Sequence, residues 1–133
     1  MKLLDTTFLV DYERGEEAVA EFLTVHEDGE EFVTSTICMK ELAVGKHAIG
    51  SPSKADLVGD YGWLRIVPFT IEHAHEAGVL EATLRADETR RDRVASLAGD
   101  VLIAGVASHL DAAVVTRNTD DFEAFEDVAV DRY

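Results

Sequence analysis

The chain has 133 residues, a length typical of one compact domain, so we expect a single domain over residues 1–133. Hydrophobic residues make up 47% of the chain and charged residues 29%, a balance that excludes an intrinsically disordered protein. The chain carries 12 basic and 27 acidic residues, which give a net charge of −15. Such a charge normally disfavours nucleic acid as a partner, because proteins bind phosphates through basic patches.

The acidic residues are spread along the whole chain. A surface of this kind suits a cytoplasm of molar salt, where the Debye length shrinks to about 3 Å and repulsion between like charges is screened. We therefore hypothesise a halophilic source, in which case the net charge does not exclude nucleic acid as a partner. No long apolar run occurs and Asp5 interrupts the first apolar residues, so we expect a cytoplasmic protein with no membrane partner. The single Cys38 excludes an internal disulfide and a zinc–thiolate site.

Short apolar segments alternate with helical patterns through the first half of the chain. In order, we expect a strand at 2–5, a helix from Thr6, a helix at 16–25, a strand at 32–34, a helix from Ser35 or Thr36 to about Val44, and a less regular segment at 47–62. Ser35 and Thr36 are favourable N-cap residues, and Gly45 is typical of the residue that ends a helix.

The second half repeats this alternation. In order, we expect a strand at 64–67, an amphipathic helix at 71–85, a polar segment at 83–93, an apolar helix at 101–110, a strand at 112–116 and a strand at 128–130. The expected inward residues of the amphipathic helix are Ala74, Ala77, Val79, Leu80 and Leu84. His73 and His75 stand two residues apart and face different directions on a helix, so we expect surface histidines and not a metal-binding pair.

The polar segment at 83–93 contains the only basic cluster of the chain. Its members are Arg85, Arg90, Arg91 and Arg93. We favour a solvated turn for this segment, and contact with the phosphates of a nucleic acid is the alternative.

The alternation of short apolar strands with helices predicts an α/β fold, in which a central parallel sheet of four to five strands is covered by helices on both faces. Ligands of such folds bind at the carboxyl ends of the strands. The side chains that follow Leu4, Thr34 and Val115 are therefore the first candidates for a functional site.

Three acidic residues stand where burial of a carboxylate is costly. Asp5 closes the first strand, where it either caps the next helix or faces a cleft. Asp100 precedes the most apolar helix, and a helix that begins near Ser96 would place Asp100 inside its first turn on the buried stripe. Glu41 lies at the margin of the apolar side of its helix, where an ordinary solvated glutamate is the alternative.

A polar loop follows the strand at 112–116. It reads Thr116-Arg117-Asn118-Thr119-Asp120-Asp121-Phe122. Such residues are common in turns for local reasons, but the position is again the carboxyl end of a strand. Phe122 provides an apolar anchor, which would let Asn118 or a following Asp face the cleft.

Four segments together resemble the PIN-domain ribonucleases, and specifically the VapC toxins of type II toxin–antitoxin pairs. They are Leu4-Asp5-Thr6-Thr7-Phe8-Leu9-Val10-Asp11, Lys40-Glu41-Leu42, Asp100-Val101-Leu102-Ile103-Ala104, and Val115-Thr116-Arg117-Asn118 with Asp121-Phe122. The resemblance covers essentially the whole chain and implies a three-layer α/β/α fold.

The resemblance further implies which residues form the site. Asp5, Glu41 and Asp100 would be the acidic metal ligands, with Thr6 and Thr116 as supporting hydroxyls. The fourth position of the family, often aspartate, falls on Asn118, so that Asp120 or Asp121 is the substitute if a charge is needed there. Carboxylate ligands favour Mg²⁺ or Mn²⁺ over zinc.

The implied activity is metal-dependent hydrolysis of RNA by an endoribonuclease toxin that a cognate antitoxin restrains, and the family implies a homodimer. The first alternative is a PIN domain of RNA processing, or a degenerate one that binds without cleaving. The second is a non-catalytic α/β signalling module similar to a response-regulator receiver. A receiver needs a lysine after its last core strand, whereas no lysine follows Lys54 in this chain.

Overall fold

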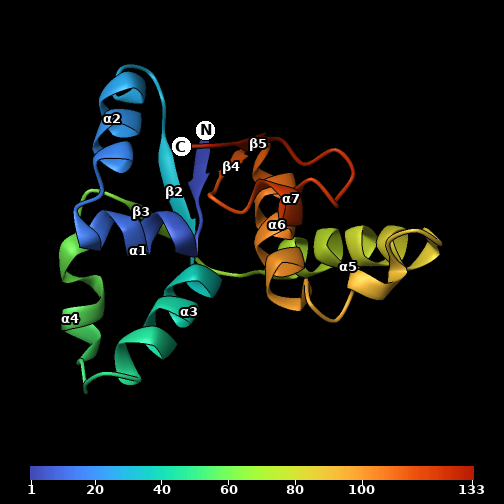
Figure 1. Ribbon diagram of the computed structural model, residues 1–133, viewed down its shortest axis with the longest axis horizontal. Coiled ribbons are helices and arrows are strands. Elements are labelled where there is room, and N and C mark those ends of the chain that lie inside the picture. The colour runs from blue at the N-terminus through green and yellow to red at the C-terminus, as the bar shows by residue number, and fades with distance from the viewer.

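The computed structural model describes residues 1–133 and contains one five-stranded sheet in which every neighbouring pair is parallel (Figure 1). The strands are β1 (Lys2–Leu4), β2 (Phe32–Ser35), β3 (Arg65–Val67), β4 (Ala113–Val115) and β5 (Val130–Asp131). The helices are α1 (Thr6–Arg14), α2 (Glu17–His26), α3 (Thr36–His47), α4 (Lys54–Val58), α5 (Ile71–Ala86), α6 (Ala98–Leu110) and α7 (Thr119–Phe122), with 3-10 turns η1 (Gly59–Tyr61) and η2 (Arg91–Arg93).

The order of the strands in the sheet determines where a ligand can bind. The order is β3-β2-β1-β4-β5, with β1 at the centre and Leu4 paired with Val115. The chain therefore builds the sheet outward from β1 on one side, then crosses to the other side to form β4. A crevice opens at the carboxyl ends of the strands at such a reversal, between β1 and β4. The order also differs from the 2-1-3-4-5 order of receivers, which argues against the receiver alternative.

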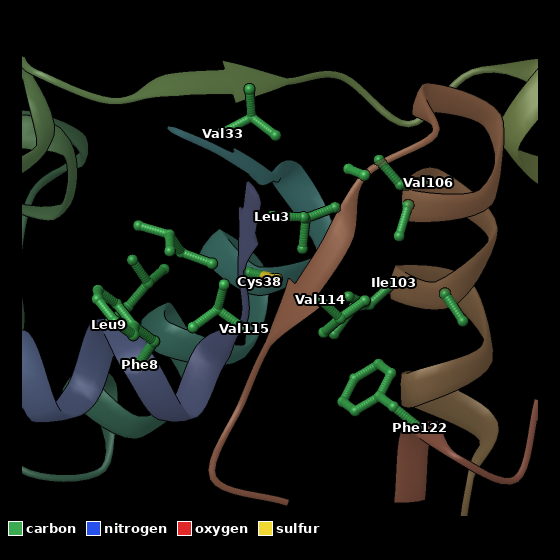
Figure 2. Close-up of a cluster of buried hydrophobic side chains, with 14 of the residues drawn as sticks. Leu3, Phe8, Leu9, Val33, Cys38, Ile103, Val106, Val114, Val115 and Phe122 are labelled. Carbon is green, nitrogen blue, oxygen red and sulfur yellow. The ribbon is translucent and has the colours of Figure 1, made fainter. Parts of the chain in front are cut away.

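Helices cover both faces of the sheet, as predicted. Figure 1 shows α1 to α4 on one side of the strands and α5 and α6 on the other. In Figure 2, Val114 of β4 points toward Ile103 of α6, while the next residue, Val115, points toward Phe8 and Leu9 of α1. All five side chains are buried. Successive residues of β4 thus supply the two halves of the core, which explains why the strand is apolar without alternation.

The close packing of α5 on α6 depends on a glycine. A Cβ atom at Gly105 would lie 2.8 Å from the Cβ of Ala77 and 2.8 Å from the carbonyl oxygen of His73. A side chain at position 105 would therefore push the two helices apart. The absence of that side chain lets the apolar α6 lie deep in the fold, where it carries Asp100 in its first turn.

Several local predictions need correction. Helix α3 continues through Gly45 to His47. Helix α6 begins at Ala98, which places Asp100 inside its first turn, as the earlier start near Ser96 would. Ala74 and Val79 of α5 are exposed, so they are not part of the inward face that Ala77, Leu80 and Leu84 form.

His73 is not a surface residue, because its side chain is only 2% exposed. Its Nδ1 accepts a hydrogen bond of 3.0 Å from the backbone N–H of Thr70, which completes a capping box at the start of α5. A histidine in this role is buried by the helix end that it stabilises. His75 is exposed as predicted. No helix combines the length and the apolar character needed to cross a bilayer.

Candidate active site

Asp5 lies at the carboxyl end of β1, in the crevice between β1 and β4. Its side chain is only 3% exposed. Oδ1 accepts a hydrogen bond of 3.0 Å from the backbone N–H of Phe8, so Asp5 is the N-cap of α1. The capping interpretation is therefore correct, and it places the carboxylate at the opening of the crevice at the same time.

Two threonine hydroxyls hold the Asp5 carboxylate in place. Thr7 donates to Oδ1 at 2.7 Å, and Thr116 of the strand-end loop donates to Oδ2 at 2.6 Å. Burial raises the pKa of Asp5 above its ordinary value of 3.8, against these hydrogen bonds, which act to lower it. The charge of Glu41 also raises the pKa. Asp5 is therefore a fixed, desolvated oxygen donor close to a second carboxylate.

Glu41 reaches the same region from α3. Thr6 Oγ1 donates a hydrogen bond of 2.9 Å to Glu41 Oε1, which ties the glutamate to the beginning of α1. The other carboxylate oxygen, Oε2, lies 3.5 Å from the position that a Cβ atom would occupy on Gly99, the neighbour of Asp100. Glu41 thus bridges α1 and the first turn of α6, and Thr6 has the supporting position that was expected of it.

Asp100 lies in the first turn of α6 and is partly buried. Its pKa is raised from 3.8 to about 6, mainly by desolvation and also by the negative charges of Asp121, Glu41 and Asp5, while Arg93 acts to lower it. The carboxylates that act on Asp100 come from the end of β1, from α3 and from α7. These carboxylates therefore interact electrostatically in one crevice.

The loop after β4 supplies its carboxylate at Asp121. The charge of Asp121 acts on Asp100, and the carboxylate forms an ion pair of 3.0 Å with Arg93 Nη2. Asn118 and Asp120 are exposed. The Asn118 backbone N–H donates to Thr116 Oγ1 at 2.9 Å, so this residue orients the hydroxyl that holds Asp5. Among the three candidates for the fourth position, Asp121 is the one whose charge acts on Asp100.

The carboxylate oxygens in this crevice are ligands that suit a hard divalent cation, although the side chains do not converge closely enough to coordinate one. No group of three or more His, Cys, Asp or Glu side chains is placed so that it could hold a metal ion. The four acidic side chains offer only oxygen donors, and their mutual repulsion raises the pKa of Asp100. A divalent cation would relieve this repulsion, and oxygen donors match Mg²⁺ or Mn²⁺. The acidic residues fit such an ion in chemistry and would rotate toward each other to share it.

Sequence reasoning did not assign a role to Thr7 or Asp11. Thr7 accepts a hydrogen bond of 3.1 Å from the backbone N–H of Arg117 while it donates to Asp5. Asp11 is buried and pairs through Oδ2 with Arg117 Nη1 at 2.8 Å and with the Tyr133 hydroxyl at 2.8 Å. The only sequence signal for Thr7 was a second hydroxyl beside Asp5. Asp11 gave none, because Arg117 and Tyr133, which contact it most closely, are remote along the chain.

Comparison with known families decides the identity of this fold. The family model for the PIN domain matches residues 2–130. A protein named Ribonuclease VapC19, from Mycobacterium tuberculosis, is 32% identical over 132 residues, which cover 96% of this chain and 97% of that protein. The chain is a PIN domain of the VapC family. The predicted resemblance is confirmed over the whole length that it was expected to cover.

Solved structures agree with this assignment. VapBC2 from Rickettsia felis, bound to a DNA fragment from its promoter, matches with a TM-score of 0.76 and 19% identity over 99% of this chain and 98% of that chain. DNA-bound VapBC from Salmonella typhimurium matches with a TM-score of 0.76 and 21% identity over 98% and 96%. FitAcB from Neisseria gonorrhoeae matches with a TM-score of 0.68 and 26% identity over 98% and 96%. The three-layer fold of this VapC-family chain is therefore that of its relatives.

Proposed function

We propose that this VapC-family PIN domain is an endoribonuclease toxin that hydrolyses RNA phosphodiester bonds with Mg²⁺ or Mn²⁺. The observation that carries the proposal is the placement of three carboxylates at the crevice between β1 and β4. Asp5 caps α1 at the end of β1, and Glu41 reaches from α3 to the neighbour of Asp100 in the first turn of α6. Asp121 adds a fourth negative charge that acts on Asp100. Repulsion among these carboxylates destabilises the metal-free protein, and a bound divalent cation would offset it. The 32% identity to a VapC ribonuclease supports the same activity.

Each residue has a separate role in this proposal. Asp5 and Asp100 would hold the ion, and Glu41 would bind or orient the attacking water. Asp121 takes the fourth position that was expected at Asn118. A bound divalent cation would polarise the phosphate and lower the pKa of the water.

The hydroxyls and the arginine act on the carboxylates. Thr7 and Thr116 fix both oxygens of Asp5, while Thr6 holds one oxygen of Glu41 and leaves the other for the water or the ion. Arg93 compensates part of the charge of Asp121. Arg93 thereby links the basic cluster at 85–93 to the site. The segment is not a simple turn as was favoured, because Arg85 lies in the last turn of α5 and Arg91 and Arg93 lie in η2.

A cognate antitoxin is the proposed protein partner, because the structural relatives include VapBC complexes and a complex described as toxin–antitoxin from Klebsiella pneumoniae. The homodimer expected from the family stays part of the proposal. Binding of an antitoxin over the acidic crevice would block access of RNA to Asp5 and Asp100.

The proposal is tested by cleavage of single-stranded RNA by the purified protein, with Mg²⁺ and with EDTA. We expect cleavage with Mg²⁺ or Mn²⁺, none with EDTA, and a loss of at least about 100-fold for Asp5→Asn and Asp100→Asn. Expression should arrest growth, and co-expression of the neighbouring antitoxin gene should relieve the arrest. Undiminished cleavage by either folded variant would show that the roles are wrong, whereas RNA binding without cleavage by the wild type would favour the degenerate alternative.

A further inference from the structure

A polar pocket lies beside the acidic crevice on the loop after β4. Its volume is about 340 Å³, and no hydrophobic residue lines it. The lining residues are Arg117, Asn118, Thr119, Asp120, Asp121 and Arg132. Asp121 belongs both to this pocket and to the set of carboxylates that act on Asp100. A ligand in the pocket would therefore touch the edge of the active site.

Arg132 is the exception among the arginines of this protein. Seven of the eight form an ion pair with a carboxylate of the chain, and Arg132 forms none. This is unexpected in a protein with a net charge of −15, where acidic partners are abundant. Arg132 is also exposed, so its guanidinium is available to an anion from outside.

Arg117 is held in place at the wall of the same pocket. Its Nη1 lies 2.8 Å from Oδ2 of the buried Asp11, and its backbone N–H donates to Thr7. The side chain is still 49% exposed. A guanidinium has five N–H donors, so the contact with Asp11 leaves others for a ligand. Arg117 is thus a pre-oriented donor, and Arg132 is an exposed donor without an ion pair.

Asp120 and Asp121 bring negative charge to the pocket. Arg93 compensates Asp121 through its ion pair of 3.0 Å. Asp120 has no ion pair and is exposed. The pocket therefore holds one arginine and one aspartate that lack an ion pair. The negative charge of Asp120 should lower the affinity of the pocket for an anion that Arg132 attracts. This opposition gives a second, independent test.

We propose that Arg132 and Arg117 bind a backbone phosphate of the RNA, adjacent to the phosphate that is cleaved. The inference rests on the proposed nuclease function, because it takes the acidic crevice as the place of the scissile phosphate. A guanidinium recognises phosphate oxygens through paired N–H donors. The two arginines supply the positive charge that an acidic protein needs to hold a strand whose reactive phosphate lies among carboxylates.

The test uses Arg132→Gln, with Arg132→Lys as the charge-preserving variant and Arg85→Gln as the matched control. Arg85 is 62% exposed on α5 and pairs with Glu81, so its loss removes the same charge away from the pocket. Because Arg132 is exposed and without an ion pair, its substitution should not affect folding. The measurements are kcat and KM for cleavage of a short single-stranded RNA. Binding of the same fluorescein-labelled RNA is measured in the Asp100→Asn background as a function of salt.

For Arg132→Gln we expect KM and Kd to rise about threefold to fivefold with little change in kcat, since exposed ion pairs are worth only modest free energies. The slope of log affinity against log salt should fall by about 0.7, the value for one phosphate contact on a single strand. Arg132→Lys should restore most of the affinity and the slope. Arg85→Gln should match the parent, and Asp120→Asn should bind RNA about twofold more tightly.

An unchanged KM, Kd and salt slope in Arg132→Gln would overturn the inference. The inference would also be overturned if Arg132→Gln weakened binding of the antitoxin but left binding of RNA unchanged. Failure of the proposed function has a different signature, because the wild type would then not cleave RNA at all.

Discussion

Thr116 and Asp5 are joined by a hydrogen bond of 2.6 Å although 111 residues separate them along the chain. The bond connects the residue after β4 to the residue after β1 at the centre of the sheet, where the strand order reverses. Asp5 also accepts hydrogen bonds from Thr7 and from the backbone of Phe8. The buried carboxylate thus has three donors, and its position is fixed before any ligand binds.

Asp100→Asn should stabilise the metal-free protein at neutral pH while it abolishes cleavage. The folded protein raises the pKa of Asp100 from 3.8 to about 6, so between these values it binds more protons than the unfolded chain. The free energy of unfolding therefore falls as the pH rises through this window, and the loss persists above pH 6. After allowance for residual solvent contact, we expect the variant to be more stable by roughly 1–2 kcal/mol at pH 7.

Urea denaturation in EDTA at several pH values measures this effect. Asp92→Asn is the control, since Asp92 is an exposed aspartate in η2. It should leave both the stability at pH 7 and the pH dependence close to those of the wild type. A lower stability of Asp100→Asn at pH 7 would show that the carboxylate is not under repulsion.

Asp11→Asn should destabilise the fold by about 1–3 kcal/mol, because it weakens an ion pair with Arg117 on a buried residue. Tyr133→Phe removes the hydroxyl that donates to Asp11 and should cost about 1 kcal/mol. Since Arg117 also contacts Thr7, we expect kcat to fall in Asp11→Asn as well. Denaturation midpoints and cleavage rates of the two variants provide the comparison, and wild-type values for both would exclude a role of Asp11 in positioning the loop.

The sequence was sufficient to predict the parallel sheet, because short apolar segments alternate with helical patterns. It also placed Asp5 and Asp100, since each carboxylate adjoins an apolar element whose direction is known. The family resemblance added Glu41, whose own surroundings along the chain are unremarkable. The sequence did not show which of Asn118, Asp120 and Asp121 provides the fourth site residue. That depends on how the short helix α7 is oriented relative to α6.

Long-range partners account for the remaining differences. Asp11 lies on a helix where a polar residue normally faces solvent, but it is buried in contact with Arg117 and Tyr133, which are remote along the chain. His73 was expected at the surface because helical spacing says nothing about a side chain that folds back to cap its own helix. Gly45 lies within α3, since a glycine ends a helix only where the backbone also turns into the left-handed region, as it does at Gly15 with φ of 71°.

His73 should make the fold sensitive to acid. Burial lowers its pKa below the ordinary value of 6.5, and the neighbouring His109, whose ring centroid lies 5.1 Å away, lowers it further. Below pH 6.5 His73 therefore binds fewer protons in the folded protein than in the unfolded chain, so its contribution to stability is lost as the pH falls. Protonation of Nδ1 would also remove the acceptor for the Thr70 N–H.

His73→Gln separates titration from capping, because glutamine at this position of a capping box can still accept from Thr70. We expect this variant to lose less stability than the wild type between pH 6.5 and pH 5, whatever its stability at pH 8. His75→Gln, at an exposed position, should retain the wild-type pH dependence. Identical slopes in all three proteins would assign the acid sensitivity to other groups.

Salt should stabilise this protein if its charge of −15 reflects a halophilic source. Screening shortens the Debye length from about 10 Å at 0.1 M to about 3 Å at 1 M and so weakens the repulsion among surface carboxylates. We expect the melting temperature to rise by roughly 5 °C over this range in KCl. Maximal thermal stability at low salt would contradict the halophilic hypothesis.

The most direct test of the proposed site is the anomalous scattering of Mn²⁺ in crystals of the protein soaked with the ion. We predict a peak in the crevice between β1 and β4, within coordination distance of carboxylate oxygens of both Asp5 and Asp100, and no such peak in Asp100→Asn. The acidic side chains would have rotated toward the ion relative to the arrangement described here. A crevice without a peak at saturating Mn²⁺, in a protein that still cleaves RNA, would contradict the assignment of these carboxylates as metal ligands.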